Sequence, residues 1–336
     1  MKVAVVLGGA SAERDISLAS GAQVLQALQS KGHKVIAVDT AHGLLSSDAC
    51  EQLIHTTIQT APPSSEELAR LSQQTAQVLS HTKELSEVDV AFLTLHGGAG
   101  EDGTIQAFLD TMQIPYTGSE HKGSALAMDK DISKQLFTHA GVPTAPWMMA
   151  PTTRDTIASK FSYPVVVKAN KQGSSVGLYI VQTWEELEKS IEKTFQFDDE
   201  VMIEQFIAGR ELTVGILGDE PLSVGEIFPL GSDVFDYQSK YQADGAREVF
   251  PADLSTELTY KAQSLALKAH RALKLRDYSR VDFRLDANNQ FWCLEVNTLP
   301  GMTSRSLLPQ SAAVSGYSFP DFCEKICLMA LERKNT

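Results

Sequence analysis

The stretch SRVDFRLDANNQFWCLEVN, residues 279–297, decides the fold of the C-terminal part of this chain. Apolar and polar residues alternate along 279–286 and again along 290–297, and an Ala-Asn-Asn segment lies between the two runs. Alternation with a period of two is typical of β-strands, and the turn residues between the runs predict a hairpin. We therefore expect an antiparallel sheet in this part of the chain.

The polar positions of this hairpin are of the kinds that bind a divalent cation. Arg280 and Asp282 share one face of the first strand, and Cys293, Glu295 and Asn297 alternate along the second. Folding about the turn brings the two sets together. A few hard oxygen donors suit Mg²⁺, which also takes phosphate oxygens. The alternative is a solvated strand face with a salt bridge, but the amide of Asn297 and the Thr-Leu-Pro-Gly that follows it favour a metal site.

The composition excludes several classes of function. The chain has 336 residues, enough for two or three domains, and its 43% hydrophobic and 21% charged residues are typical of a globular protein. A net charge of −13 disfavours nucleic acid and anionic membranes as partners. No apolar run approaches the roughly 20 residues of a membrane span. The four cysteines lack the spacing of a zinc site, so we expect reduced thiols in a cytoplasmic protein.

Two different patterns of secondary structure divide the chain. The N-terminal part alternates short apolar strands with helical segments, which predicts an open α/β domain with a parallel sheet. An insertion at 44–87 interrupts this pattern with one or two expected helices. Later segments predict antiparallel hairpins and an α+β body. The expected strands are 2–7, 34–38, 88–95 and 114–116, then 163–168, 176–181, 200–207, 211–217 and 221–228, and a helix is expected over 255–274.

Three loops are candidates for ligand binding. The small residues of 173–177 expose backbone N–H groups to phosphate oxygens, and Lys168 precedes them, although a plain turn is the alternative. Glycine-rich turns at 8–13 and 96–103 follow strands of the parallel sheet, so Glu13 and His96 are expected to face one crevice. The alternatives are a helix-start carboxylate and a core histidine. The aromatic, lysine-containing stretch 235–241 is a candidate lid or an ordinary exposed loop.

Taken in order, short motifs along nearly the whole chain resemble the D-alanine–D-alanine ligases of the ATP-grasp superfamily. They are LGGASAERDISLASG (7–21), HGGAGEDGTIQ (96–106), YTGS (116–119), MDK (128–130), VVVKANKQGSSVG (165–177), IEQFIAGRELTV (203–214), DYQSKY (236–241), SRVDF (279–283) and LEVNTLPGMTSRSLLP (294–309). The resemblance implies an ATP-grasp fold of mixed α/β and α+β class with three lobes. These are an N-terminal open parallel α/β lobe (1–122), a small central α+β lobe with the Gly/Ser loop (123–210) and a C-terminal antiparallel α+β lobe with the lid and the metal hairpin (211–336).

The resemblance also implies a reaction. ATP phosphorylates one D-alanine, a second D-alanine attacks the acyl phosphate, and a tetrahedral intermediate yields D-alanyl-D-alanine for peptidoglycan precursors. Two Mg²⁺ ions, with Mn²⁺ as a substitute, and a cytoplasmic homodimer are implied as well. The alternatives are a related ligase that joins D-alanine to another amino or hydroxy acid, and a nucleotide-binding scaffold without catalysis. The presence of Arg280, Asp282, Glu295 and Asn297 favours an enzyme over a scaffold.

Residue roles follow from the same resemblance. For the nucleotide they are Lys130 and Lys168 at the phosphates, Glu204, Gln205, Phe206 and Ile207 at adenine, Glu211 at ribose, and Ser174, Ser175, Lys240 and Asn297 as further contacts. The implied metal ligands are Asp282, Glu295 and Asn297. For the amino acids they are Glu13 and His96 at the first D-alanine, Ser306 and Leu307 at the second, with Lys240 and Arg280 also contacting substrate. Arg280 and the N–H of Gly301 face the developing oxyanion, and Glu13, Ser174 and Tyr241 form a triad that fixes the lid.

One departure from the family pattern concerns the second amino acid. Arg305 stands next to Ser306, where histidine is common in the family. The Lys240-Tyr241 pair follows the dipeptide-forming pattern of the lid, so we predict D-alanine rather than D-lactate as the second substrate.

Overall fold

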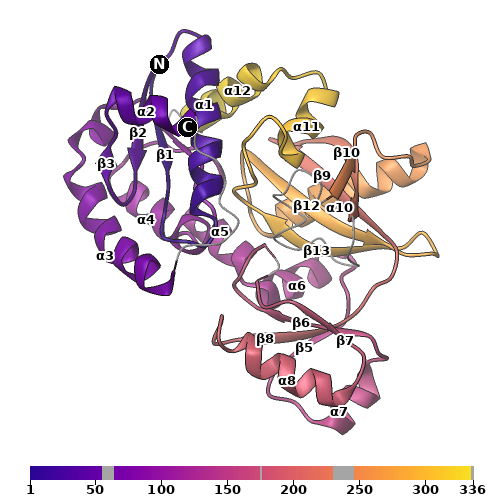
Figure 1. Ribbon diagram of the computed structural model, residues 1–336. Coiled ribbons are helices and arrows are strands. Elements are labelled where there is room, and N and C mark those ends of the chain that lie inside the picture. Colours follow the sequence, from indigo (N-terminus) through magenta and orange to yellow (C-terminus); the bar gives the residue numbers. More distant parts are fainter. Residues whose placement is uncertain (55–63, 175, 230–245, 334–336) are drawn as a thin grey trace.

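The computed structural model describes residues 1–54, 64–174, 176–229 and 246–333 (Figure 1). Three sheets organise the chain, and each belongs to a different part of the sequence. Ser175, Lys240 and Tyr241, which the sequence places at the site, lie outside the described residues. No described helix is long and apolar enough to cross a membrane.

The N-terminal sheet has the strand order β3-β2-β1-β4. β1 pairs in parallel with both β2 and β4, which confirms the expected parallel sheet, and only the two-residue β3 runs antiparallel. The strand expected at 114–116 is reduced to a single parallel bridge between Ala91 and Tyr116. The elements are β1 (Lys2–Leu7), α1 (Arg14–Ser30), β2 (Lys34–Asp39), β3 (Gly43–Leu44), α2 (Ser47–Ile54), α3 (Ser65–His81), β4 (Val90–Leu93) and α4 (Thr104–Thr111).

The end of the chain returns to this N-terminal sheet. Helix α12 (Phe319–Glu332) packs against α1 and β4, as Figure 1 shows in yellow beside indigo. Its buried residues Phe322, Cys323 and Ile326 belong to the same apolar core as β1. The first and last parts of the sequence are therefore held together by a shared core.

The central sheet is antiparallel throughout and has the order β5-β8-β6-β7. Helices α7 and α8 cover one face of it (Figure 1). Thr153 and Thr183 cap these helices by accepting hydrogen bonds from backbone N–H groups. The predicted hairpin around the Gly/Ser loop is confirmed. The elements are β5 (Trp147–Met149), α7 (Arg154–Lys160), β6 (Val165–Ala169), β7 (Tyr179–Val181), α8 (Trp184–Thr194) and β8 (Val201–Gln205).

The C-terminal sheet is also antiparallel and has the order β11-β10-β9-β12-β13. The predicted helix and both predicted hairpins are present. The elements are β9 (Arg210–Leu217), β10 (Glu220–Pro229), β11 (Ala246–Val249), α10 (Thr256–Ala272), β12 (Tyr278–Leu285), β13 (Phe291–Asn297) and α11 (Leu307–Val314).

The hairpin β12–β13 contains a register shift that the sequence pattern does not show. Asp282 pairs with Glu295, but the next residue, Phe283, pairs with Cys293, so Leu294 has no partner opposite it. Such a bulge reverses the alternation of the strand. Cys293 therefore lies in the apolar core, and the prediction that it shares a face with Glu295 is wrong.

Helices α5 (His121–Met128) and α6 (Lys130–His139) connect the lobes. Ala127 and Phe137 from these helices pack into the core of the C-terminal sheet, although the sequence assigns them to the central lobe. A bridge between Thr144 and Cys293 continues this attachment. The central sheet thus follows a segment that is anchored on the C-terminal one.

Candidate active site

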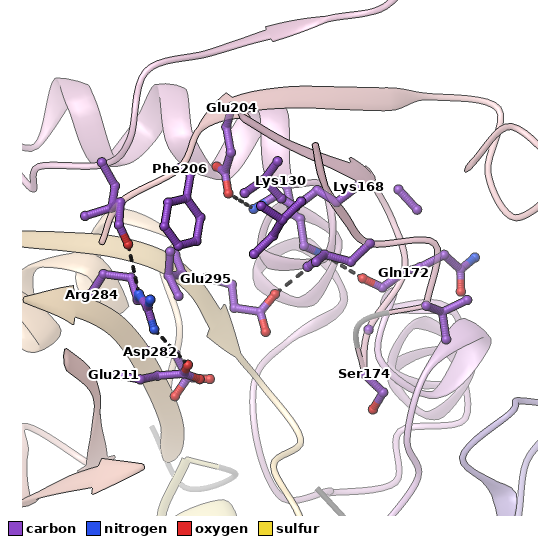
Figure 2. Close-up of a pocket in the computed structure, with 18 of the residues that line it drawn as sticks. Lys130, Lys168, Gln172, Ser174, Glu204, Phe206, Glu211, Asp282, Arg284 and Glu295 are labelled. Carbon is purple, nitrogen blue, oxygen red and sulfur yellow. Dashed lines mark hydrogen bonds and ion pairs between the residues drawn. The ribbon is translucent and has the colours of Figure 1, made fainter. Parts of the chain in front are cut away.

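A pocket of ≈ 1030 Å³, partly open to solvent, lies between the central and C-terminal sheets (Figure 2). The predicted site residues that line it are Lys130, Lys168, Ser174, Glu204, Gln205, Phe206, Ile207, Glu211, Arg280, Asp282, Glu295 and Leu307. The other lining residues are Val166, Ala169, Gln172, Gly173, Val176, Leu178, Ile180, Ile227, Arg284 and Leu294. Polar groups on an otherwise apolar lining are typical of a small-molecule site.

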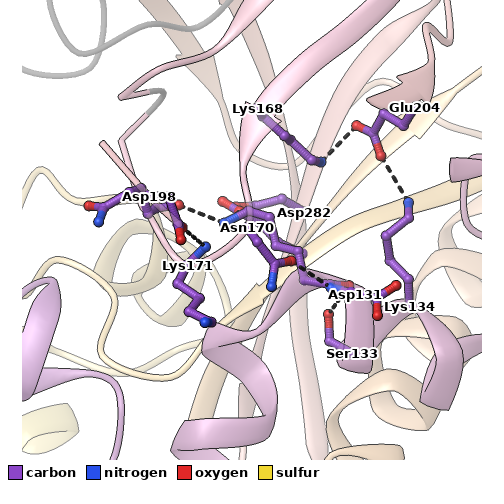
Figure 3. A network of polar contacts seen from close by, with 12 residues as sticks. Asp131, Ser133, Lys134, Lys168, Asn170, Lys171, Asp198, Glu204 and Asp282 are labelled. Atoms are coloured by element: carbon purple, nitrogen blue, oxygen red, sulfur yellow. Dashed lines mark hydrogen bonds and ion pairs between the residues drawn. The ribbon is translucent and has the colours of Figure 1, made fainter. Parts of the chain in front are cut away.

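Lysines gather on the wall that the central sheet contributes. The ammonium of Lys168, on β6, lies 2.7 Å from Oε1 of the buried Glu204, on β8. A second lysine, Lys134, lies 2.9 Å from Oε2 (Figure 3). Burial alone would raise the pKa of Glu204, but the two ammonium groups hold it at about 2. This carboxylate is therefore ionised and neutralises one of the two positive charges.

Lys130 begins α6 at the junction of the two walls. Its ammonium donates a hydrogen bond to the carbonyl of Gln172, at 2.6 Å, and lies 3.6 Å from Glu295. Burial lowers the pKa of Lys130, and the negative charge of Glu295 opposes that shift. The lysine thus joins the Gly/Ser loop region to the carboxylate side of the pocket.

Carboxylates gather on the opposite wall, on the hairpin β12–β13. Asp282 accepts hydrogen bonds from Thr213 at 2.7 Å and from two nitrogens of Arg280, at 3.0 and 2.7 Å. Glu295 lies directly opposite Asp282 in the register, and Asn297 lies opposite Arg280. The predicted metal ligands are therefore neighbours on two paired strands.

The donor set fits a cation that shares its coordination with phosphate. Among the described residues no three His, Cys, Asp or Glu side chains form a cluster that could hold a metal on its own. Two carboxylates and one amide remain on the hairpin, and Mg²⁺ is usually bound by one or two carboxylates together with substrate phosphates.

Arg284 organises the far end of the pocket and was not assigned a role from the sequence. It donates to the carbonyl of Ile207 at 3.1 Å and forms an ion pair with Glu211 at 3.2 Å. Its guanidinium carbon lies 5.8 Å from the ring centroid of Phe206. The alternation of β12, which places Arg284 on the face of Asp282, is the signal that could have found it.

The side chain of Gln205 is used differently from its neighbours. Its amide bonds the backbone of Ser162 in both directions, at 2.9 and 3.0 Å. The Gln205 side chain therefore braces the rim of the pocket.

The Gly/Ser loop reaches the N-terminal domain. Ser174 adopts a left-handed backbone conformation with φ of 49° and is buried. Its hydroxyl donates a hydrogen bond to Oε1 of Glu13. Two members of the predicted triad are thus brought together, while Tyr241 lies outside the described residues. A strained backbone held by a contact between domains is typical of a functional site.

The two glycine-rich turns of the N-terminal domain meet at Glu13. A side chain at Gly97, where φ is +66°, would bring a Cβ within 3.4 Å of Glu13 Oε2, so only glycine suits this turn. His96 is buried, burial lowers its pKa, and its Nε2 lies 3.4 Å from the hydroxyl of Ser20. The neutral ring therefore lies beside Ser20 of α1 and does not line the pocket itself.

Glu101 is a second buried carboxyl of these turns, and no role was predicted for it. It accepts a hydrogen bond from the N–H of Gly97 at 3.0 Å. Burial, followed by the negative charge of Glu13, raises its pKa to about 8. A carboxyl in this position is protonated near neutral pH.

The segment after β13 lies between the pocket and the N-terminal domain. A Cβ on Gly301 would lie 2.7 Å from Ser306 Oγ, so the backbone approaches this hydroxyl closely. Ser306 occupies the N-cap position of α11 without a side-chain capping hydrogen bond, and the next residue, Leu307, lines the pocket. The N–H of Met302 donates to Ser20 on α1 at 3.2 Å. The predicted second-substrate residues thus lie between the C-terminal sheet and the N-terminal domain.

Two antiparallel sheets that enclose a pocket, with lysines on one and carboxylates on the other, define the ATP-grasp class of fold. Two family models match the chain: "D-ala D-ala ligase N-terminus" over residues 2–119 and "D-ala D-ala ligase C-terminus" over residues 136–328. The chain belongs to the D-alanine–D-alanine ligase family.

Relatives and solved structures agree with this assignment. The chain is 41% identical to the D-alanine–D-alanine ligase of Syntrophobacter fumaroxidans, over 99% of this chain and 98% of that protein. It is also 41% identical to the enzyme of the same name from Geobacter sulfurreducens, over 98% and 94%. The Bacillus anthracis D-alanine–D-alanine ligase complexed with ATP superposes with a TM-score of 0.79, at 28% identity, over 100% and 99% of the chains. The VanG D-Ala:D-Ser ligase of Enterococcus faecalis superposes with a TM-score of 0.80, at 28% identity, over 98% and 99%.

Proposed function

We propose that this protein joins two D-alanine molecules into D-alanyl-D-alanine, with conversion of ATP to ADP and phosphate, for peptidoglycan precursor synthesis. One observation carries the proposal: Ser174, which lines a pocket with lysines and carboxylates, donates a hydrogen bond to Glu13 of the N-terminal domain. A nucleotide and an amino acid would then meet at one place. Membership of the family supplies the reaction.

ATP is proposed to lie between the two walls. Lys130 and Lys168 contact its phosphates, and Glu211 accepts hydrogen bonds from the ribose. Adenine lies against the strand end formed by Glu204, Gln205, Phe206 and Ile207. The support is that all seven residues line one pocket, with the lysines at one end and the Arg284–Glu211 pair at the other (Figure 2).

Asp282, Glu295 and Asn297 would hold two Mg²⁺ ions, for which Mn²⁺ would substitute. The opposition of Asp282 and Glu295 in the hairpin supports this. When bound, the ions neutralise phosphate charge during transfer. Arg280, which is paired with Asp282, completes the charge balance of this wall.

The chemistry follows from positioning and charge neutralisation. A carboxylate oxygen of the first D-alanine attacks the γ-phosphorus, ADP leaves, and an acyl phosphate forms. The amine of the second D-alanine, after losing a proton, attacks the carbonyl carbon, and phosphate leaves from the tetrahedral intermediate. We propose that Arg280 and the N–H of Gly301 stabilise the oxyanion of that intermediate.

The amino acids are placed by the N-terminal domain and by α11. Glu13 binds the ammonium of the first D-alanine, and the neutral His96 lies beside it. Ser306 and Leu307, at the N-terminal end of α11, bind the carboxylate of the second, which the helix dipole favours. This placement is supported by the hydrogen bonds that tie Met302 and Ser304, just before α11, to α1.

Several further assignments stay predictions. Ser175 is proposed to contact the nucleotide. Lys240 and Tyr241 are proposed to belong to the lid, which Tyr241 fixes over the site together with Glu13 and Ser174. We also propose the three lobes 1–122, 123–210 and 211–336, a homodimer through the N-terminal region, and a cytoplasmic location, where ATP is available to the enzyme. The four cysteines are free thiols, which agrees with a reducing compartment.

A second candidate differs in the second substrate. The similar Enterococcus structure is named a D-Ala:D-Ser ligase, and Arg305 lies beside the proposed carboxylate site of this chain. Phosphate release with ATP and Mg²⁺ should be measured across D-alanine, L-alanine, D-serine and D-lactate, with products identified by mass. We expect release and D-alanyl-D-alanine with D-alanine alone. A mixed product at neutral pH would show that the second substrate is not D-alanine. No turnover with any of these acids would favour the non-catalytic nucleotide-binding scaffold.

A further inference from the structure

Lys134 is a buried cation that the proposed mechanism does not use. It lies on α6, and its side chain is 0% exposed. Its ammonium contacts Glu204 at 2.9 Å and Thr144 at 2.7 Å, and lies 5.1 Å from the ring centroid of Trp147. It does not line the pocket. Figure 3 shows it on the side of Glu204 that faces away from Lys168.

The unfavourable free energy of burying the Lys134 ammonium indicates that this residue has a function beyond stability. Removing a charged group from water is unfavourable by several kcal/mol unless it is paired, and apolar residues of similar volume are often at least as stabilising. Here three charged side chains lie together: Lys134, Glu204 and Lys168. Each carboxylate oxygen of Glu204 is bonded by a different lysine. The cluster therefore keeps one net positive charge next to the pocket.

That remaining charge lies on the side of Lys168. Lys168 lines the pocket, whereas Lys134 is enclosed by α6, Thr144 and Trp147. Without Lys134, the negative charge of Glu204 would be countered by Lys168 alone. The field that Lys168 presents to an anion in the pocket would then be largely cancelled.

We propose that Lys134 is a positioning residue for the nucleotide phosphates, a role that rests on the proposed binding of ATP. It neutralises Glu204 from behind, and this leaves the charge of Lys168 available to the phosphates. A purely structural role, in which Lys134 only ties β8 to the segment that carries Thr144, is the competing explanation.

The two explanations predict different effects of substituting Lys134 on the binding of ATP and of adenosine. Glu204 also lies at the proposed adenine end, so a distorted β8 would weaken adenosine and ATP alike. Cancellation of the Lys168 charge by Glu204 would weaken the binding of ATP and leave the binding of adenosine almost unchanged. Adenosine carries no phosphate and is therefore the probe that separates them.

Binding of Mg²⁺–ATP and of adenosine to the full chain should be measured by titration calorimetry for the wild type, Lys134→Met and Lys189→Met. Lys189 is an exposed lysine of α8 and serves as the matched control. We expect Lys134→Met to weaken ATP about ten-fold, equivalent to loss of one charge-assisted contact. Adenosine affinity should change less than about two-fold. If Lys134→Met weakened the binding of both ligands equally, or changed the binding of neither, the inference would be overturned.

A double variant protects the test against simple misfolding. Lys134→Met combined with Glu204→Gln restores one net positive charge to the cluster, so we expect the affinity for ATP relative to adenosine to recover most of the loss. A double variant whose affinity for ATP relative to adenosine stays as low as that of Lys134→Met would contradict the proposed role. If the wild type itself binds no ATP, the proposed function fails together with this role. If the wild type binds ATP and Lys134→Met binds it equally well, only the role of Lys134 fails.

Discussion

The two walls of the pocket carry net charges of opposite sign. The lysine wall carries Glu204 and Lys168, and Lys134 bonds Glu204 from behind the wall, so an acid lies between two bases. The carboxylate wall consists of Arg280, Asp282 and Glu295, and a base lies among acids. In each wall most of the charge is neutralised within the wall, and one charge remains.

The difference in sign explains what can bind between them. A triphosphate alone would be repelled by the carboxylate wall, and a divalent cation alone by the lysine wall. A metal–triphosphate complex presents phosphate oxygens to one wall and metal to the other, so it satisfies both. Under the proposed binding of ATP and metal, the walls would select the complex, and substitutions in each should affect different kinetic parameters.

The largest effect is expected from the carboxylate wall. Glu295→Gln keeps the shape of the side chain but removes its charge, so the proposed metal ions lose a ligand during phosphoryl transfer. We expect kcat for D-alanine-dependent phosphate release to fall at least about 100-fold. Glu257→Gln, on the exposed start of α10, is the control and should retain full activity. Near-normal kcat in Glu295→Gln would remove this residue from the site.

The lysine wall should act mainly on nucleotide binding. Lys168→Met removes a charged contact to the phosphates, so we expect KM for ATP to rise about 10- to 100-fold. The KM for D-alanine should change much less, because Glu13 and Ser306 belong to other segments. A change confined to D-alanine in steady-state kinetics would show that the walls have been assigned to the wrong ligands.

A substitution of Arg284 tests the end of the pocket that lies away from the lysines and is proposed to hold the ribose. Arg284→Ala removes the contacts to Glu211 and to the carbonyl of Ile207. We expect the dissociation constants of ATP and adenosine to rise together, by about 5- to 10-fold. Fluorescence or calorimetric titration of both ligands measures this. An effect on ATP without one on adenosine would place the ribose elsewhere.

The smallest expected effect on turnover concerns Glu101, a buried carboxyl outside both walls, whose substitution should change stability instead. No ion pair to it is found in the described part of the chain, in contrast to Glu204. Its folded-state pKa of about 8 lies above the ordinary 4.5. Between these values the folded state keeps a proton that the unfolded chain releases, so the free energy of unfolding falls as pH rises through this window.

Glu101→Gln should remove that decline. Relative to the wild type, we expect the variant to gain about 3 kcal/mol in unfolding free energy between pH 5 and pH 8. Urea unfolding at several pH values measures it. A wild type whose stability rises over the same range in step with the variant would show that Glu101 is ionised in the folded protein.

Local patterns predicted most of the fold. The alternation and turn residues of 279–297 are sufficient for a hairpin because both signals lie within one short stretch. The shift at Leu294 could not be predicted, because a bulge depends on how two residues face one partner on the other strand. The return of α12 to the N-terminal sheet was missed for a similar reason, since an apolar helix does not reveal which core buries it.

The site shows the same division. Lys130, Lys168, Asp282 and Glu295 lie in motifs that could be found along the sequence, and the structure places all four around one pocket. The contact of Lys134 with Glu204 joins residues that are 70 positions apart and lie in no common motif. Charge compensation between distant segments is set by packing, so only the folded chain shows it.

The central claim is that a carboxylate of D-alanine is phosphorylated in this pocket before the peptide bond forms. D-alanine labelled with ¹⁸O in both carboxylate oxygens tests it directly, with the released phosphate examined by mass spectrometry. The acyl-phosphate route predicts that one ¹⁸O is transferred to phosphate for each dipeptide made. Phosphate that carries no label, released together with D-alanyl-D-alanine, would contradict the proposed reaction.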